Sequence, residues 1–307
     1  MTKRDFLTVD ALTPAELTCL LDEADRLKAQ RAHRRDLAGL AVGMLFEKPS
    51  TRSRVSFEVA VTELGGHAVV LSGGDLQLGR GETVEDTARV LSRYLHALVV
   101  RTFAQSRLEA LAASGSIPVV NALSDFSHPC QALADLQTIR ERKGRLAGVR
   151  LAYLGDGNNV ANSLLLAGAM TGMRVAMGCP PGYAPIPQVV TAAQTLAAES
   201  GGEIVVTADP LAAADGADAV YTDVWASMGQ EAERDARRLM FHPFQVSRHV
   251  MEVADPDAIV LHCLPAHRGE EITAEVLDGP QSAVWDQAEN RLHTQKALLA
   301  LLVGSSR

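Results

Sequence analysis

The chain has 307 residues, of which 47% are hydrophobic and 21% are charged, and its formal net charge is −8. These values are ordinary for a globular protein of two domains and exclude a disordered chain. The acidic balance argues against binding to nucleic acid or to an anionic membrane, so an anionic small molecule would need a local cluster of basic side chains.

The first residues and the cysteines narrow the class further. The opening segment, MTKRDFLTVDALTPAEL, lacks the apolar core of a signal peptide, and no run approaches the ~20 apolar residues of a membrane span. The four cysteines form no C-x-x-C pair, so we expect no zinc knuckle, redox motif or disulfide framework; they are Cys19, Cys130, Cys179 and Cys263. The sequence predicts a cytoplasmic enzyme.

The first predicted helix has a clear start. Thr13 is a good N-cap, Pro14 occupies the first helical position, and Glu16 completes a capping box. The helix is expected to run to about Ala32.

Short apolar strands and amphipathic helices then alternate along the chain. The first series of strands is predicted at Ala41–Phe46, Ala68–Ser72, Ala97–Thr102 and Pro118–Asn121. The second series is predicted at Leu151–Leu154, Arg174–Gly178, Glu203–Thr207, Asp218–Thr222 and Ala258–His262. Helical patterns between them include Ser53–Leu64, Val84–Tyr94, Gln131–Arg142 and Ala161–Met170. This alternation predicts an α/β fold of two domains, each a parallel sheet flanked by helices.

A charged segment with two glycines, ERKGRLAGVR at residues 141–150, separates the two series of strands. We therefore expect a first domain at residues 1–143 and a second at 144–286. The last segment, 287–307, is expected to form a helix that packs back on the first domain. In open parallel sheets ligands bind beyond the carboxyl ends of the strands, so functional residues should directly follow strands.

The first such segment is EKPSTRSR, residues 47–54, which follows the strand at 41–46 and precedes a helical pattern. Hydroxyls and a guanidinium at a helix N-terminus, where backbone N–H groups are unpaired, make a phosphate pocket. The alternative is a plain helix cap with surface arginines. Arg54 points away from Arg52 on a helix, and we expect a structural ion pair for it.

Three more segments of the first domain carry polar residues. Residues 72–82, SGGDLQLGRGE, are glycine-rich and typical of a mobile loop. Arg101 ends the strand ALVVR, and DFSHPCQ at residues 125–131 precedes a long helix. Arginine and histidine donors held around a carbonyl oxygen stabilise the charge that develops there under nucleophilic attack. A lone histidine or a strand-end arginine is otherwise often structural.

In the second domain, LGDGNNVAN at residues 154–162 partly matches a dinucleotide fingerprint. The third glycine of that fingerprint is replaced by Val160, and no acidic residue ends the next strand. An NAD-dependent dehydrogenase is therefore supported only by Gly155 and Gly157.

Two later motifs follow strands as well. DVWASMGQE, residues 223–231, contains a glycine that suits a closing lid, although a surface turn is the simpler interpretation. HCLPAHRG, residues 262–269, contains two histidines and a cysteine, but their spacing matches no standard zinc site. Its Leu264–Pro265 bond is a candidate cis peptide.

Together these motifs resemble those of the aspartate and ornithine carbamoyltransferase superfamily, in the expected order along the whole chain. STRSR resembles the S-T-R-T-R signature for carbamoyl phosphate, with Ser53 in place of the commoner threonine. DFSHPCQ contains the H-P-x-Q motif, and 154–162 resembles the D-x-x-N-x-x-N stretch. The DVWASMG and HCLP motifs are similar to those of the ornithine-specific members.

The resemblance implies the residues of two substrate sites. The carbamoyl phosphate site would comprise Ser50, Thr51, Arg52, Ser53, Gln77, Arg101, His128, Pro129, Cys130, Gln131, Cys263, Leu264 and Arg291. The L-ornithine site would comprise Asn159, Asp223, Ser227 and Met228. The implied catalytic residues are Arg101, His128, Asp223 and Cys263. The family assigns Cys130 no nucleophilic role.

The resemblance also implies a homotrimer in which the loop carrying Gln77 reaches a neighbouring subunit's site. The implied reaction belongs to arginine metabolism and needs neither a cofactor nor a metal. Aspartate and putrescine are alternative acceptors within the superfamily. The Asp223/Cys263 pair and the S-M-G loop favour ornithine over both.

Overall fold

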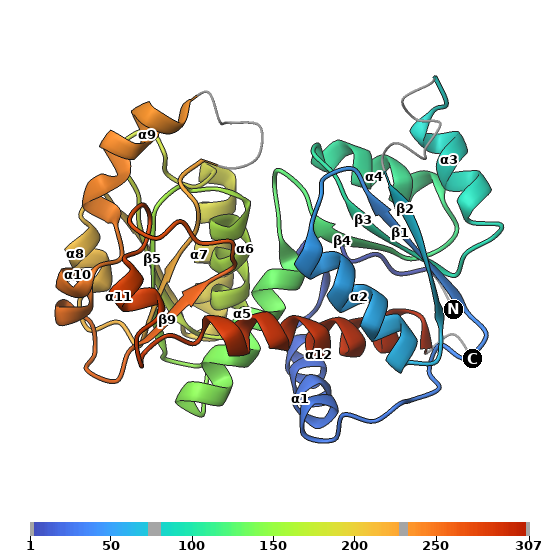
Figure 1. The fold of residues 1–307 in the computed structure, drawn as a ribbon, viewed down its shortest axis with the longest axis horizontal. Helices are drawn as coiled ribbons and strands as arrows, with labels where there is room; N and C mark the ends of the chain where they lie inside the picture. The colour runs from blue at the N-terminus through green and yellow to red at the C-terminus, as the bar shows by residue number, and fades with distance from the viewer. Residues whose placement is uncertain (1–2, 73–80, 227–232, 305–307) are drawn as a thin grey trace. The chain divides into compact units, whose positions relative to one another are not determined.

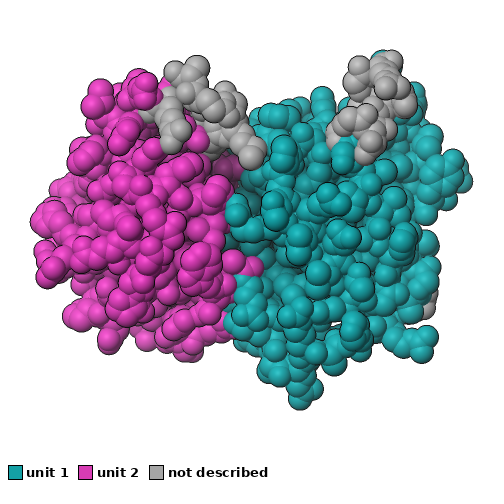
Figure 2. Space-filling model, viewed as in Figure 1, with its two compact units in different colours: residues 1–134, 289–307 teal, residues 135–288 magenta. Residues whose placement is uncertain are grey.

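A computed structural model describes residues 3–72, 81–226 and 233–304. The chain divides into two compact units, residues 1–134 with 289–307 and residues 135–288, which are coloured separately in Figure 2. Each unit contains one parallel sheet with helices around it, which confirms the predicted fold class (Figure 1). No helix in these described ranges is long and apolar enough to cross a membrane.

The first unit is built on four strands in the order β2-β1-β3-β4, and every neighbouring pair is parallel. The strands are β1 (Ala41–Phe46), β2 (His67–Ser72), β3 (Ala97–Arg101) and β4 (Val119–Leu123). The helical elements of this unit are η1 (Val9–Ala11), α1 (Pro14–Ala29), α2 (Thr51–Glu63), α3 (Val84–Leu91) and α4 (Gln105–Ser114). β1 and β3 are almost wholly buried, which explains why each reads as a continuous apolar run.

The capping box predicted for the first helix is present. The Thr13 hydroxyl accepts the Glu16 backbone N–H at 3.2 Å, and the Glu16 carboxylate accepts the Thr13 backbone N–H at 2.8 Å. Two N–H groups that the helix itself leaves unpaired are thereby satisfied. The helix ends at Ala29, slightly before the predicted end.

The C-terminal helix α12 (Val284–Leu302) packs on the first unit, as predicted, and runs beside α1 and α2 in Figure 1. The fully buried Lys296 donates to the Glu63 carboxylate at the end of α2, at 2.7 Å. Arg31 pairs with the same carboxylate at 2.8 Å. A charge removed from water needs such a partner, so this pair fixes α12 against α2.

The second unit is built on five parallel strands in the order β7-β6-β5-β8-β9. They are β5 (Arg150–Leu154), β6 (Arg174–Gly178), β7 (Glu203–Thr207), β8 (Ala219–Thr222) and β9 (Ile259–His262). The helical elements are α6 (Asn159–Met170), α7 (Pro187–Ser200), α8 (Pro210–Ala214), α9 (Arg234–Phe241), η5 (His242–Phe244), α10 (Arg248–Val253) and α11 (Ala274–Leu277). Helix α5 (Pro129–Lys143) begins in the first unit and ends in the second.

The strand order determines where ligands should bind. In each sheet the chain moves outward in both directions from a central pair, β1 with β3 in the first and β5 with β8 in the second. At such a point successive loops diverge, and the carboxyl ends of the two strands form the usual ligand site of an open parallel sheet. The predicted motifs follow these strands.

Candidate active site

We use the name donor half-site for the residues of the first unit that are predicted to bind carbamoyl phosphate, the expected donor of the carbamoyl group. Its described members are Ser50, Thr51, Arg52, Ser53, Arg101, His128, Pro129, Cys130, Gln131 and Arg291. They lie at the carboxyl ends of β1, β3 and β4, and on α12. The register pairs Phe46 with Arg101, so the N-terminus of α2, which follows β1, is adjacent to Arg101.

The start of α2 is fixed by two hydroxyl groups. The Ser50 side chain accepts the Ser53 backbone N–H at 3.2 Å, which makes Ser50 the N-cap and starts the helix at Thr51, two residues before the predicted start. The Ser53 hydroxyl accepts a hydrogen bond from Arg291, and both side chains are buried. A guanidinium from α12 thus reaches the positive end of α2.

His128 is surrounded by guanidinium groups. Burial, followed by the charges of Arg291, Arg101 and Arg52, holds the pKa of this histidine well below its usual range. The imidazole is therefore neutral at physiological pH and has one N–H to donate. Motifs that are far apart in the sequence bring three positive charges to one buried ring. Such a cluster in an acidic protein is arranged for an anion.

A fourth cation, Lys48, belongs to this region and was not predicted. Its ammonium lies 4.1 Å from the centre of the Phe103 ring. Burial, and then the charge of Arg101, lower its pKa. The position of Lys48 inside the EKPSTRSR motif is the sequence feature that could have predicted its place in the site. Arg54, in contrast, is exposed and lies 3.8 Å from Glu58 one turn further along α2, in agreement with the expected structural ion pair.

The first turn of α5 carries Pro129, Cys130 and Gln131. Burial raises the pKa of Cys130 to about 12, and its S–H donates to the Asn121 carbonyl at 3.3 Å. The sulfur is therefore a protonated thiol, which is a poor nucleophile. This environment agrees with the absence of a nucleophilic role for Cys130.

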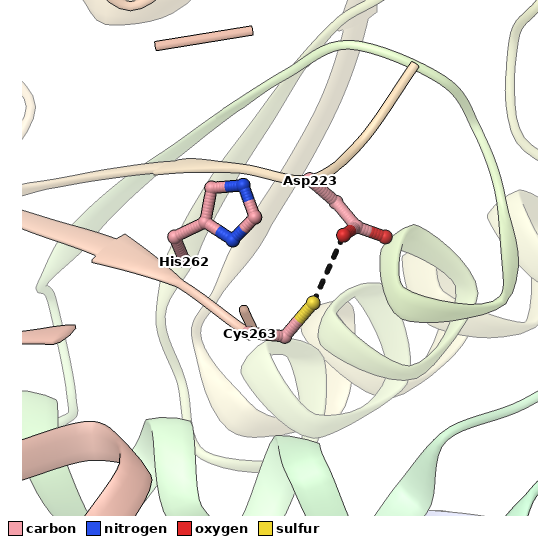
Figure 3. Close-up of side chains that lie close together, drawn as sticks. All are labelled: Asp223, His262 and Cys263. Carbon is pink, nitrogen blue, oxygen red and sulfur yellow. Dashed lines mark hydrogen bonds between the residues drawn. The ribbon is translucent and has the colours of Figure 1, made fainter. Parts of the chain in front are cut away.

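A second group of residues lies in the second unit, and we call it the acceptor half-site after the expected acceptor of the carbamoyl group. Its members are Asn158, Asn159, Asp223, Cys263 and Leu264. Its residues follow β5, β8 and β9, which are neighbouring strands. The buried Asp223 carboxylate accepts from the Asn158 amide at 2.8 Å and from the Cys263 thiol at 2.9 Å. Figure 3 shows the thiol pointing at the carboxylate. The predicted Asp223/Cys263 pair is thus a direct contact.

Asn158 is a residue of this half-site to which sequence reasoning assigned no role. Its side-chain oxygen caps α6 by accepting the N–H groups of Val160 at 2.9 Å and Ala161 at 3.2 Å. The amide nitrogen is left to donate to Asp223. An asparagine directly before a helical pattern signals an N-cap, but not the second contact. Asn159 is the first residue of α6 and lies at the positive end of that helix.

His262 lies beside this pair. The ligand atoms of Asp223, His262 and Cys263 are all within 4.8 Å of one another. Both nitrogens of His262 already have partners, because Nδ1 accepts the Leu264 N–H at 2.8 Å and Nε2 lies 3.1 Å from Glu271 Oε1. A metal ion bound by His262 would have to displace one of these hydrogen bonds. The absence of a metal from the site stays a prediction. The Leu264–Pro265 peptide is cis.

The two glycines that suggested a dinucleotide site have other causes. Gly155 has φ +140°, a conformation that residues with a Cβ rarely adopt. A Cβ on Gly157 would stand 2.2 Å from the backbone nitrogen of Pro185. Backbone geometry and packing therefore require both glycines, and the dehydrogenase interpretation loses its support.

Three predicted site residues lie outside the described residues: Gln77, Ser227 and Met228. Their roles stay predictions.

Comparison with known proteins identifies the class to which this fold and site belong. The family model described as "Aspartate/ornithine carbamoyltransferase, carbamoyl-P binding domain" matches residues 4–141. The model described as "Aspartate/ornithine carbamoyltransferase, Asp/Orn binding domain" matches residues 147–302. The chain belongs to the aspartate/ornithine carbamoyltransferase family, which confirms the resemblance drawn from its motifs.

Within this family, proteins similar to this chain include several ornithine carbamoyltransferases. One from Parafrankia sp. is 63% identical over 99% of this chain and 97% of its own length. An anabolic one from Pyrococcus furiosus is 53% identical over 98% of this chain and 96% of its own length. A solved structure of the ornithine carbamoyltransferase from P. furiosus superposes with a TM-score of 0.97 at 52% identity, covering 100% of this chain and 99% of the other.

Proposed function

We propose that this protein transfers the carbamoyl group of carbamoyl phosphate to the side-chain amine of L-ornithine, giving L-citrulline and phosphate. The observation that carries the proposal is the neutral His128 within a cluster of arginine charges, a donor set suited to a phosphorylated carbonyl compound. The names of the relatives support ornithine as the acceptor. The anabolic relative supports a role in arginine biosynthesis.

The donor half-site would bind carbamoyl phosphate through two kinds of contact. Ser50, Thr51, Arg52 and Ser53 at the N-terminus of α2 would bind the phosphate, with Arg291 alongside. In the same unit Arg101 and His128 would donate to the carbamoyl oxygen, and Gln131 would accept from the carbamoyl NH2. Pro129 and Cys130 would line the same site. Preorganised donors of this kind are worth about 3–4 kcal/mol each in related oxyanion sites.

The acceptor half-site would bind ornithine between a helix N-terminus and a carboxylate. Asn159, at the start of α6, would bind the α-carboxylate. Asp223 would receive the side-chain ammonium, with Cys263 beside the reacting nitrogen. The Leu264 carbonyl would hold the carbamoyl NH2. Ser227 and Met228 would contact the amino-acid end of the substrate.

The reaction requires the acceptor amine to lose a proton. An amine like that of lysine has a free pKa of about 10.4, and only its neutral form can attack the carbamoyl carbon. The ammonium first loses one proton to solvent. Attack then forms the new N–C bond, the tetrahedral intermediate breaks its C–O bond to expel phosphate, and the departing phosphate takes one of the two protons left on the attacking nitrogen. Arg101 and His128 would stabilise the negative charge on the carbamoyl oxygen in between. Carbamoyl phosphate is already activated, so no cofactor or metal enters the scheme.

We propose the assignment of carbamoyl phosphate binding to residues 1–143 and of ornithine binding to residues 144–286, with the helix at 287–307 returning to the first domain. We also propose a homotrimer in which Gln77 reaches a neighbouring site, and a cytoplasmic location. Large apolar side chains exposed on the first unit support an interface there: Val55, Val90, Tyr94 and Phe103. Analytical ultracentrifugation tests the trimer.

A citrulline assay tests the function. Carbamoyl phosphate is supplied with ornithine, aspartate or putrescine in parallel reactions, and product is expected with ornithine alone. Turnover of aspartate or putrescine in place of ornithine would reject the proposal. Aspartate would need cations in the acceptor half-site, where the described polar groups are instead a carboxylate, amides and a thiol.

A further inference from the structure

A buried pair of side chains lies behind the acceptor half-site, and the sequence motifs assign a role to neither. His262 ends β9, and Glu271 lies in the segment before α11. Both side chains are completely buried, and His262 Nε2 is 3.1 Å from Glu271 Oε1. Buried polar side chains are costly unless they are hydrogen-bonded, so a buried polar pair next to Cys263 requires a structural or functional explanation.

The hydrogen bonds determine the tautomer of His262. The Leu264 backbone N–H donates to Nδ1, so this nitrogen carries no proton. Nε2 therefore carries the proton and donates it to Glu271. Burial acts to raise the pKa of Glu271, but the hydrogen bonds from His262 and from the His267 backbone outweigh it and lower the pKa. The carboxylate is ionised and orients the ring.

The backbone that this ring holds is unusual. Among described residues other than glycine, Leu264 alone has a positive φ, 58°. A conformation of this kind is costly for a residue with a Cβ and persists only where the surroundings hold it. The bond from Leu264 N–H to His262 is such a restraint. The same turn places the Cys263 thiol 2.9 Å from Asp223.

We propose that Glu271 is a positioning residue: acting through His262, it holds the Cys263–Leu264 turn in the conformation that presents the Cys263 thiol to the acceptor amine. The proposal rests on the proposed function, because it takes ornithine as that acceptor. Glu271 itself touches no reacting atom. Its loss should therefore change the constants for ornithine more than the affinity for carbamoyl phosphate, which depends mainly on the arginine cluster of the donor half-site and only in part on the Leu264 carbonyl.

The first test compares two substitutions of Glu271. In Glu271→Ala, kcat/KM for ornithine should fall roughly 10- to 100-fold, the scale of one hydrogen bond to a charged group. Glu271→Gln keeps an oxygen that accepts from His262 and should stay within about threefold of wild type. In calorimetry the affinity for carbamoyl phosphate should fall less than kcat/KM for ornithine in Glu271→Ala, and should stay at the wild-type value in Glu271→Gln. Equal losses in Ala and Gln variants would contradict a role as hydrogen-bond acceptor.

A matched control separates positioning from loss of stability. Glu63 is also a buried carboxylate that accepts hydrogen bonds, here from Lys296 and Arg31, but it belongs to the first unit. Glu63→Gln should lower the unfolding temperature without changing kcat/KM for ornithine. If Glu63→Gln and Glu271→Ala reduce kcat/KM alike, the effect of Glu271 is structural only.

A double-mutant cycle tests whether Glu271 acts through His262. In His262→Asn the side-chain oxygen can replace Nδ1 as acceptor for Leu264, but the side chain is too short to reach Glu271. Adding Glu271→Ala to His262→Asn should then cost little more, and additive losses would overturn the proposed relay. Should Glu271→Ala fail to fold, His262→Asn alone must lower kcat/KM for ornithine, because it breaks the same link.

A second readout does not require any acceptor. Cys130 and Cys179 are buried with pKa values of about 12, and Cys19 is exposed, so a Cys19→Ser chain leaves Cys263 as the reactive thiol. Iodoacetamide should alkylate Cys263 faster after Glu271→Ala and at the parent rate after Glu271→Gln. If the wild type is active and Glu271→Ala changes neither the constants for ornithine nor the alkylation rate of Cys263, the proposal is overturned. If the wild type makes no citrulline but Glu271→Ala still speeds alkylation of Cys263 relative to the parent, only the proposed function is overturned.

Discussion

Each half-site lies at the carboxyl edge of the parallel sheet in its own unit, but the charges of the two half-sites differ. In the donor half-site three arginines lie around a neutral histidine, and Lys48 adds a further cation beside Arg101. In the acceptor half-site a carboxylate accepts hydrogen bonds from an amide and a thiol, neither of which is charged. The strand order provides the location in both cases, and only the side chains after the strands decide which ligand is preferred.

The difference suggests that each unit recognises one substrate by charge. A phosphorylated donor carries negative charge, which the arginine cluster complements, whereas the ammonium of ornithine complements Asp223. Substitution of a charged residue in one half-site, such as Arg52 or Asp223, should therefore change mainly the binding of one substrate.

The largest effect is expected for Arg52→Ala. Removing the guanidinium that we propose makes charged hydrogen bonds to phosphate should weaken carbamoyl phosphate binding roughly 100- to 10,000-fold in calorimetry. Arg54→Ala is the matched control, because Arg54 is exposed and pairs with Glu58, and its variant should bind as wild type does. Near-normal affinity of Arg52→Ala would refute the donor assignment.

Asp223→Asn should act on the other substrate. The amide keeps an acceptor for the Cys263 thiol but loses the charge, so kcat/KM for ornithine should fall roughly 10- to 100-fold in steady-state assays. Carbamoyl phosphate affinity should stay unchanged. Asp257→Asn, at an exposed position of the same unit, should have neither effect. A parallel loss of carbamoyl phosphate affinity in Asp223→Asn would show that the two recognitions are not separate.

The charge cluster should also appear in the pH dependence of stability. Below the ordinary histidine pKa of about 6.5, the unfolded chain binds a proton that His128 in the folded chain does not bind. Stability is therefore lost as the pH falls through this range. In urea unfolding, His128→Gln should lose about 1 kcal/mol less than wild type between pH 6.5 and pH 5.5. The variant His33→Gln, at an exposed position, should follow wild type.

The smallest effect is expected away from both half-sites. Thr13→Ala removes the capping box of α1 and should lower the free energy of unfolding by about 1 kcal/mol without changing kcat or either KM. Thr18→Ala removes only a hydroxyl that donates to the Pro14 carbonyl within the helix, and should cost less. Altered kinetics in Thr13→Ala would mean that the half-sites depend on the position of α1.

Much of the fold could be predicted because local signals agree with the tertiary structure. The predicted bounds of β1, β6 and β7 match the structure, since buried parallel strands are short apolar runs with clear ends. The sequence defines the starts of helices less sharply than the ends of strands. α2 and α6 begin two residues before their predicted starts, because Ser50 and Asn158 act as N-caps there.

The unpredicted part of the site depends on contacts between distant residues. Asn158 binds Asp223 only because β5 and β8 are neighbours. Glu271 reaches His262 because the chain turns back after Leu264 with a positive φ. Neither partner can be read from spacing. Asn158 and Asp223 are separated by several helices and strands, and Glu271 follows an irregular segment after His262 that has no periodic pattern.

The buried link between Lys296 and Glu63 has a consequence for truncated forms of the chain. A premature stop codon after position 296 would spare the ammonium that neutralises Glu63. A stop only two codons earlier would leave that carboxylate inside the protein with Arg31 as its remaining partner. Both truncations also remove the buried Leu298, Leu299 and Leu302, so the difference in stability between the two truncated chains isolates the cost of the poorly paired carboxylate from the shared loss of apolar packing.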